Sequence, residues 1–375
     1  MILHLSKFYH PYFGGLEKVV QDLAESSTQD DSVTVICNSY EAKKTEVENI
    51  NGVKVVKCPI NFTLMSSQFS VAYFSELGKR IENSILHIHL PNPFSTFFVL
   101  FYLFLRKKCK GVVVHWHSDV VSQKVGWFFL RPFVNKLLEL SDKIVVTSPP
   151  YLDSSKQLMK FKHKCEVIPI GIESIESKVN SKIVEDIRER YKGKKVIFSV
   201  GRHTYYKGFE ILIEAVRSGF EDCVFLIGGV GELTASYQKL IDKYGLSEQV
   251  FLIGKLTEKD LASYFFSAEV FCFPSCERSE AYGLVQLEAM SVGTPVISAN
   301  ILGSGVPWVN KHLESGLIFK NGSVSELKDA LLLILNDSDL RHQLSLGAKN
   351  RFENNFTIRD MNNKTAQLYL DVING

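Results

Sequence analysis

The stretch CERSEAYGLVQLEAMSVGTPVIS, residues 276–298, decides the fold and the function that this sequence predicts. Apolar residues recur at helical spacing over 282–292, and the Gly-Thr-Pro that follows predicts the end of that helix. Two glutamates, Glu280 and Glu288, stand on this stretch with seven residues between them. At a rise of 1.5 Å per residue, we expect them to lie about 12 Å apart along the helix axis.

Two carboxylates at this separation suit the two hydroxyl-rich ends of a sugar–diphosphate–ribose. Between them, the helix N-terminus would direct the N–H groups of Gly283 and Leu284 at the diphosphate, because free amides and the helix dipole favour an anion. The spacing by itself also fits two solvent-exposed helix glutamates, so the interpretation depends on the rest of the chain.

On either side of this stretch, short β-rich runs alternate with helical segments, the pattern of a doubly wound parallel sheet. In such sheets, ligands bind beyond the carboxyl ends of the strands. A capping box at Thr257 predicts the start of one helix. Strands are predicted at 195–200, 224–227, 250–253, 270–273 and 296–298, and helices at 209–216, up to 244 and at 257–267.

Two cations follow the strand predicted at 195–200. Arg202 and Lys207 lie between Gly201 and Gly208, just before a helix. Fixed positive charge at a helix N-terminus is what a departing diphosphate needs, although surface cations in salt bridges would give the same pattern. Gly231, after the next strand, could contribute a backbone amide to the same site.

The first half of the chain predicts a second sheet of the same kind. The turn at Gly14 and Gly15 joins its first strand to a helix, where backbone amides could approach an anion. The turn is not GxGxxG, so it does not indicate a dinucleotide cofactor. Strands are predicted at 2–9, 33–37, 53–57, 86–90, 111–117, 144–147 and 166–169, and helices at 16–25, 69–83, 94–108 and 126–141.

Histidines cluster at the predicted strand ends. His115 and His117 alternate on one strand, and we expect them to point away from each other and to have separate roles. His117 lies nearer the strand's end, where a ligand would bind; a hydrogen-bonded structural histidine is the alternative.

The chain therefore predicts two Rossmann-like doubly wound domains with a cleft between them. The first covers 1–172 and the second 173–356, with a charged stretch at 173–189 leading into a short helix. Helices are predicted to start at Ser323 and at Asp337 or Ser338, and a last one covers about 357–375.

Composition bounds the class of protein. The 375 residues carry a net charge of +2, which gives no reason to expect nucleic-acid binding. The seven cysteines are scattered, and reduced, buried thiols are expected. The apolar run at 94–105 is too short to cross a bilayer. It predicts a buried helix, with a membrane-surface contact beside the basic residues 106–110 as the alternative.

Five motifs, taken in order, resemble the nucleotide-sugar-binding half of the family 4 glycosyltransferases, retaining enzymes of the GT-B fold. They are GRHTYYKGFEILIEA, GGVGEL, GKLTEKDLASYFFSAEVFCFPS, CERSEAYGLVQLEAMSVGTPVIS and ESGLIF. In the first half, FYHPYFGGLEKVV and VVVHWHSDVV look like the family's acceptor-side glycine loop and histidine strand. The resemblance covers nearly the whole chain, and it implies that the last helix crosses back to the first domain.

The resemblance implies transfer of a hexose from an NDP-sugar to an acceptor hydroxyl with the anomeric configuration kept. Arg202 and Lys207 would stabilise the leaving group, and backbone near Leu256 would contact the base. No metal is expected, because the helix N-terminus and the cations do that work. The roles implied for the carboxylates and the histidine are donor-sugar binding by Glu280, ribose binding by Glu288, and a contact of His117 near the anomeric carbon.

The sequence motif EAYGLVQLEAM resembles most closely those of bacterial transferases that build O-antigen or other surface polysaccharide on a lipid carrier. This implies a lipid-linked glycan acceptor and a cytoplasmic enzyme, with possible peripheral contact at the inner face of the membrane. GDP-mannose is the first choice of donor, and a UDP-hexose or UDP-N-acetylhexosamine the second. The alternatives are a transferase that makes a soluble glycoside, an NAD-linked dehydrogenase and a non-catalytic sugar-nucleotide-binding protein.

Overall fold

The computed structural model describes residues 1–375 except 13, 30–31, 65–66, 106 and 120–123. The chain divides into two compact units. Unit 1 comprises Met1–Ile170 and Ile358–Gly375, and unit 2 comprises Gly171–Thr357. No helix in the described parts of the chain is long and apolar enough to cross a membrane.

Unit 1 is built on a sheet with the strand order β10-β9-β8-β7-β1-β2-β4-β3. Its strands run parallel except β3, which pairs antiparallel with β4. Because both faces are covered, the central strands are buried along their whole length. The strands are β1 (Ile2–Leu5), β2 (Val33–Ser39), β3 (Glu46–Ile50), β4 (Val53–Pro59), β7 (Ile85–Leu90), β8 (Gly111–Trp116), β9 (Lys143–Val146) and β10 (Cys165–Val167).

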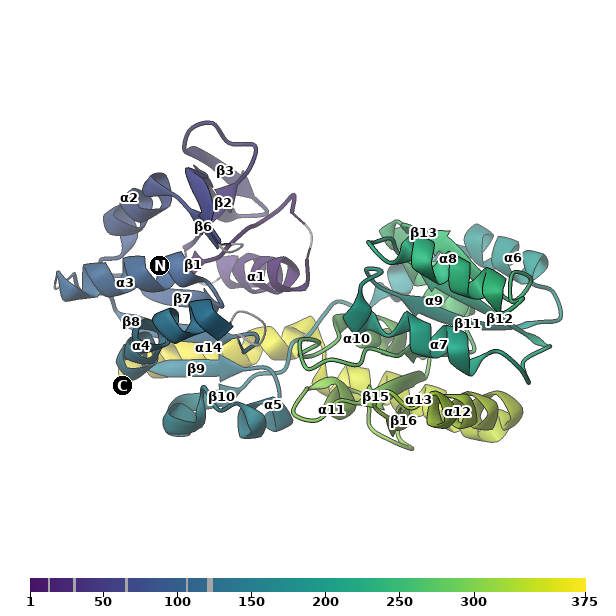
Figure 1. Ribbon diagram of the computed structural model, residues 1–375. Coiled ribbons are helices and arrows are strands. Elements are labelled where there is room, and N and C mark those ends of the chain that lie inside the picture. Colours follow the sequence, from purple (N-terminus) through teal and green to yellow (C-terminus); the bar gives the residue numbers. More distant parts are fainter. Residues whose placement is uncertain (13, 30–31, 65–66, 106, 120–123) are drawn as a thin grey trace. The chain divides into compact units, whose positions relative to one another are not determined.

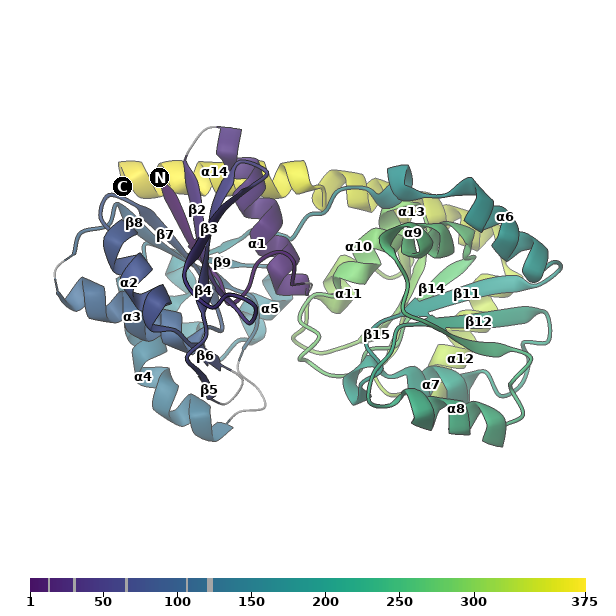
Figure 2. The ribbon, with the colours of Figure 1, turned by 90° about the horizontal axis from the view of Figure 1, so that it is seen from above.

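Six α-helices of the described chain belong to unit 1. The last of them, α14, contacts α1 and β8, so the chain's C-terminal end packs on its first unit (Figures 1 and 2). Its buried residues Met361, Thr365, Leu368, Tyr369 and Val372 recur at helical spacing and form the face that packs on the unit. The helices are α1 (Gly15–Ser26), α2 (Val71–Arg80), α3 (Pro93–Phe104), α4 (Lys124–Leu140), α5 (Pro149–Ser154) and α14 (Ile358–Asn374).

Four strands were not predicted: the edge strand β3, the hairpin strands β5 (Phe62–Leu64) and β6 (Ser67–Phe69), and β16 (Gly316–Lys320) of unit 2. β3 is largely exposed, and all three residues of β5 are exposed. Neither strand therefore carries the apolar run from which the other strands were inferred.

Unit 2 contains a fully parallel sheet with the strand order β13-β12-β11-β14-β15-β16. Figure 2 shows this sheet between α9 and α10 on one side and α7 and α8 on the other. The strand order reverses between β11 and β14, which makes the loops after these two strands the topological switch point. The strands are β11 (Lys195–Val200), β12 (Cys223–Gly228), β13 (Val250–Gly254), β14 (Val270–Phe273), β15 (Val296–Asn300) and β16 (Gly316–Lys320).

Helix starts in unit 2 follow the capping chemistry of the sequence. Thr257 and Asp260 form the predicted capping box, and Ser323 and Asp337 cap the next two predicted helices. The helices are α6 (Ser181–Arg190), α7 (Phe209–Ala215), α8 (Thr234–Lys243), α9 (Glu258–Ser267), α10 (Leu284–Ser291), α11 (Val306–Val309), α12 (Val324–Asn336) and α13 (Ser338–Asn355).

The helix of the opening stretch is shorter than predicted. α10 begins at Leu284 rather than at residue 282, because Gly283 adopts a left-handed conformation with φ +76°. Glu280 therefore lies in the loop before the helix, and the expectation of about 12 Å along one helix axis is wrong.

Candidate functional site

The switch point of unit 2 brings together two of the predicted site residues. Lys207 ends the short 3-10 helix η4 (Tyr205–Lys207) after β11, and Glu280 lies in the loop after β14. The Nζ atom of Lys207 is 2.5 Å from Oε2 of Glu280, and the two side chains are 12% and 13% exposed. A nearly buried ion pair thus joins the two loops where a parallel sheet binds its ligands.

Glu280 is held on both its side chain and its backbone. Ser275 donates a hydrogen bond to Oε2 at 3.2 Å, while the Ser304 hydroxyl donates to the Glu280 carbonyl at 2.5 Å. Oε2 is therefore shared by Lys207 and Ser275, whereas Oε1 has no hydrogen-bond partner among the described residues. One carboxylate oxygen remains available to accept from a ligand hydroxyl.

Lys207 lies in an aromatic and glycine-lined setting. Its ammonium group lies 5.2 Å from the ring centre of Phe273 and 5.4 Å from that of Tyr206. Gly208 follows with φ +67°, and a Cβ atom there would lie 2.1 Å from the carbonyl oxygen of Pro274. Only glycine permits this approach of the two loops, which brings Lys207 to Glu280.

Arg202 differs from Lys207 in having an exposed side chain and no ion-pair partner in the described chain. Its backbone carbonyl accepts a hydrogen bond from Thr204 N–H at 2.8 Å. The same loop therefore carries one cation bound to a carboxylate and one that is free to meet an anion.

The predicted role of the Gly231 amide is corrected by the structure. Its N–H already donates to the Thr234 hydroxyl at 2.9 Å, so it is not free for a phosphate. A Cβ atom at Gly231 would lie 2.4 Å from the His203 carbonyl oxygen, which shows how closely the loops after β11 and β12 approach. Thr234 also contacts Nδ1 of the buried His203 at 2.9 Å. The sequence did not predict the contact of Thr234 with His203, because a single threonine belongs to no recognisable motif.

The N-terminus of α10 follows the glutamate loop directly. Gly283 is its N-cap, and Leu284 its first residue, so their N–H groups have no intrahelical acceptor. The buried Gln286, which the sequence did not single out, donates from Nε2 to the Tyr282 carbonyl at 3.1 Å and braces this turn. Farther along the sheet edge, Leu256 lies against Gly228, where an added Cβ would be 3.0 Å from its Cδ1.

Glu288 lies one turn into α10 and is half-buried. Its Oε2 atom is shielded from solvent, and its carbonyl accepts from the Ser291 hydroxyl at 2.8 Å. It is not the solvent-exposed helix glutamate that was the alternative interpretation.

In unit 1, Gly14 and Gly15 form the start of α1. Gly14 is the N-cap, and a Cβ there would lie 2.2 Å from Oε2 of Glu17, a first-turn residue. The Glu17 carboxylate thus lies close to the Gly14 backbone at the start of α1.

His117 follows β8 immediately and is half-buried. The expectation that His115 and His117 point apart is wrong: their ring centres are 4.1 Å apart and the planes differ by 6°. Residues i and i+2 of a strand share a face of the sheet, which brings both rings to one side. Burial lowers the pKa of His117 to about 3.

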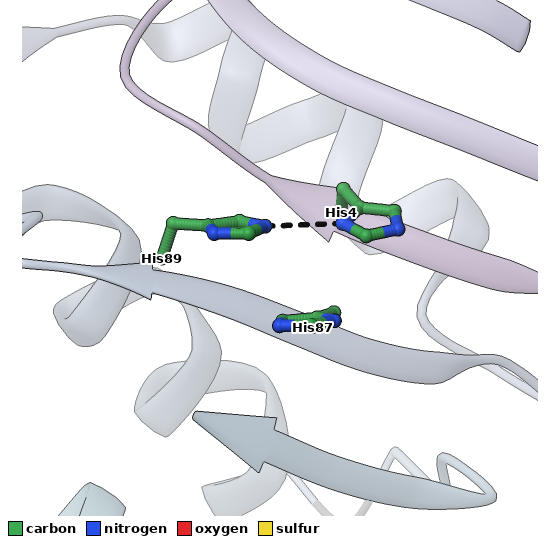
Figure 3. A group of neighbouring side chains, drawn as sticks. All are labelled: His4, His87 and His89. Carbon is green, nitrogen blue, oxygen red and sulfur yellow. Dashed lines mark hydrogen bonds between the residues drawn. The ribbon is translucent and has the colours of Figure 1, made fainter. Parts of the chain in front are cut away.

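Three further buried histidines extend this group across the sheet: His4 of β1, and His87 and His89 of β7. Figure 3 shows His4 and His87 from neighbouring strands, with His89 bonded to His4. Nitrogen atoms of His4, His87 and His89 lie within 4.8 Å of one another, as do those of His89, His115 and His117. These are the candidate metal-binding groups within the described chain.

Both halves of the chain match known sequence families. The model described as "Glycosyltransferase Family 4" matches residues 13–174, and the one described as "Glycosyl transferases group 1" matches residues 181–351. The chain is 30% identical to an O-antigen chain mannosyltransferase C of Escherichia coli, over 99% of this chain and 98% of that protein. It is 29% identical to a D-rhamnosyltransferase of Pseudomonas aeruginosa, over 95% of this chain and 92% of that protein.

Solved structures share the fold at low identity. Anabaena HepE in complex with UDP has a TM-score of 0.80 at 16% identity, with 99% of both chains covered. A sucrose-phosphate synthase from Thermosynechococcus elongatus has a TM-score of 0.78 at 18% identity, covering 99% of this chain and 98% of that one.

Proposed function

Because this chain belongs to glycosyltransferase family 4, we propose that it transfers mannose from GDP-mannose to a lipid-linked glycan with retention of configuration. That it is a hexosyltransferase of the GT-B fold follows from the family and the relatives. The dehydrogenase alternative is therefore wrong. Donor, acceptor and stereochemistry are the proposed parts.

The observation that carries the proposal is the ion pair of Lys207 with Glu280 at the switch point of unit 2. A diphosphate that departs beside it gains charge, and Lys207 with the unpaired Arg202 would stabilise that charge. Glu280 would keep Oε2 on Lys207 and accept a sugar hydroxyl through Oε1. The contact between Lys207 and Glu280 thus positions both the cation and the carboxylate that would bind the sugar.

The remaining contacts of the donor follow the same sheet edge. The N–H groups of Gly283 and Leu284, which have no acceptor within α10, would bind the diphosphate, and half-buried Glu288 would bind the ribose hydroxyls. Leu256 and Gly228 would border the base. The Gly231 amide is left out, because it is bound to Thr234.

GDP-mannose is favoured because several relatives are named as mannosyltransferases. They include the E. coli protein and a GDP-mannose-dependent enzyme of Mycobacterium tuberculosis. UDP-sugars are the second choice, because HepE is solved with UDP-glucose. A thermal-shift series with GDP, UDP and ADP, and then with their sugars, tests this. A larger shift with UDP than with GDP would reverse the order.

Retention is proposed to proceed by front-face substitution, in which the departing phosphate oxygen takes the acceptor's proton. His117 is proposed to contact the donor sugar. Proton NMR of the first product tests the stereochemistry, since an inverted anomeric centre would overturn this mechanism. Transfer in excess EDTA tests metal independence, and loss of activity that Mg²⁺ restores would contradict it.

A surface of unit 1 suits an acceptor held at a membrane. The α3 segment exposes Phe101, Phe104 and Leu105, and α4 exposes Phe128, Phe129 and Phe133. We call these six side chains the aromatic surface. The two helices contact each other, with the Phe97 and Phe133 rings 4.6 Å apart. Exposed Lys108, Lys110 and Arg131 lie in the same segments. Exposed aromatic side chains near lysine and arginine are typical of proteins that bind the interface of anionic lipids.

A further inference from the structure

The buried histidines of unit 1 form two hydrogen-bonded sets. In the first, which we call the histidine row, Nδ1 of His4 lies 3.0 Å from Nε2 of His89, and Nδ1 of His89 lies 3.0 Å from Nε2 of His117. In the second, Nε2 of His87 lies 3.3 Å from Nδ1 of His115, and Nδ1 of His87 lies 2.5 Å from the Tyr369 hydroxyl of α14. Only the row contains His117.

The geometry of the rings fits a hydrogen-bonded array better than a metal centre. The planes of His4, His87 and His89 differ by 6° to 23° and the rings are stacked (Figure 3), so their lone pairs lie in nearly parallel planes and do not all converge on one ion. Within the row, neighbouring nitrogens point at each other at hydrogen-bond distance.

A neutral imidazole has one N–H donor and one acceptor nitrogen, so the row can hold its protons in only two ways. Burial lowers the pKa of His4 to about 3 and that of His89 well below its ordinary value, so both rings are neutral near pH 7. If His89 donates to His4, then His117 donates to His89, and Nδ1 of His117 is a bare acceptor. If His4 donates to His89, every bond reverses, and Nδ1 of His117 carries a proton.

The far end of the row decides between these two states. Nε2 of His4 is buried and has no hydrogen-bond partner among the described residues. In the first state it is an N–H without an acceptor, and in the second an acceptor without a donor. A buried N–H without an acceptor is the rarer and costlier case. The second state, with a proton on Nδ1 of His117, is therefore favoured.

We propose that His89 and His4 are positioning residues that hold His117 as its Nδ1–H tautomer, so that His117 donates a hydrogen bond to an oxygen atom of the substrate. Nδ1 of His117 has no partner among the described residues, and the side chain is half-buried at the end of the row. Free histidine prefers the Nε2–H tautomer, so the row would impose the less common form. The catalytic part of this inference rests on the proposed contact of His117 with the donor.

The tautomer can be measured directly in the full-length protein. Long-range ¹H–¹⁵N NMR spectra distinguish Nδ1–H from Nε2–H histidine, and a His117→Asn variant identifies the His117 signals among the ten histidines. We expect Nδ1–H in the wild type and a shift to Nε2–H in His89→Leu. An Nε2–H tautomer in the wild-type protein would overturn the proposal.

Activity tests whether His89 acts through His117. His89→Leu should lower kcat/KM about tenfold or more, in the range of residues that orient a functional histidine. His89→Asn places an amide near the lost Nδ1 and should recover part of the loss. Because His89 would act only through His117, His89→Leu should cost little more in a His117→Ala background. Full additivity of the two losses would contradict the proposal.

His115→Leu is the matched control. His115 is buried and stacks on both His89 and His117, but it is bonded to His87 and not to the row. The His115→Leu variant should lower thermal stability as His89→Leu does. It should leave kcat/KM within about twofold of the wild type and the His117 tautomer unchanged. An equal loss of kcat/KM in both variants would show a structural role only. Unchanged activity of His117→Ala would instead overturn the proposed donor contact, and the tautomer measurement would still decide the state of the row.

Discussion

Lys207 and Glu280 are 73 residues apart in the sequence, yet their side chains form a 2.5 Å ion pair at the switch point of unit 2. The ion pair joins the cation proposed to stabilise the leaving group to the carboxylate proposed to bind the sugar, so removing either side chain is expected to disturb both proposed functions. In a mostly buried setting, the carboxylate left behind would also lack compensation for its charge.

Lys207→Ala is expected to lower kcat more than tenfold with the fold intact, because one lost transition-state contact is worth about 2–4 kcal/mol. Steady-state kinetics with GDP-mannose and circular dichroism measure the two effects. Lys311→Ala is the control, since Lys311 is an exposed lysine of unit 2 whose partner is Glu314. Unchanged kcat in Lys207→Ala would remove the residue from the mechanism.

Glu288→Ala is expected chiefly to raise the KM for the donor, because a ribose contact made equally in the ground state and the transition state affects binding alone. Titration with GDP should show a matching rise in its dissociation constant. A loss confined to kcat would be inconsistent with ribose binding.

Gly208→Ala is expected to destabilise unit 2, because the alanine Cβ would meet the Pro274 carbonyl 2.1 Å away. The matched control is Gly245→Ala, where φ is +68° against +67° at Gly208 but nothing lies within 4 Å of an added Cβ. Both variants carry the cost of a left-handed residue, about 1 kcal/mol or more. The extra fall in melting temperature of Gly208→Ala measures the close approach, and equal falls would show that the loops separate freely.

Acid should unfold unit 1 before unit 2. Burial lowers the folded-state pKa of all five clustered histidines, to about 3 for His4 and His117. Their stabilising effect is complete above the unfolded pKa of about 6.5 and is lost as the pH falls toward the folded value, because the unfolded chain then binds protons that the folded chain does not. Each such histidine lowers the free energy of unfolding by about 1.4 kcal/mol for every pH unit that the pH falls within that window.

The measurement is tryptophan fluorescence of a Trp308→Phe variant, in which the remaining tryptophans, Trp116 and Trp127, both belong to unit 1. We expect a cooperative transition between pH 6 and pH 4, less steep when His115→Leu removes one titrating group. A flat signal down to pH 4 would contradict the pKa shifts.

The aromatic surface predicts binding to anionic vesicles. Phe104 and Phe128 are 84% and 74% exposed, and changing both to Glu should abolish co-flotation with phosphatidylglycerol vesicles, because it removes apolar contact and adds repulsion. Leu302→Glu is the control, with an 82% exposed apolar residue on unit 2. A Lys108→Glu, Lys110→Glu variant, which changes two exposed lysines, separates the electrostatic part. Equal flotation of wild type and the Phe104, Phe128 variant would exclude this surface.

The sequence by itself determined most of the strands and helices, because buried parallel strands are continuous apolar runs and capping residues mark helix starts. It also predicted which residues would bind a nucleotide sugar, from Arg202 and Lys207 to the two glutamates. It missed β3 and β5, which are largely exposed and lack an apolar run, and it also missed β6 and the mostly buried edge strand β16.

Only the tertiary structure decided which of these groups meet. The positive φ of Gly283 moved the helix start and left Glu280 in a loop, where it reaches Lys207 across the switch point. The histidines come from three strands and meet because parallel register places His4 beside His87 and His89 beside His115. Pairing between distant strands is a property of the folded sheet, and no local pattern in the sequence encodes it.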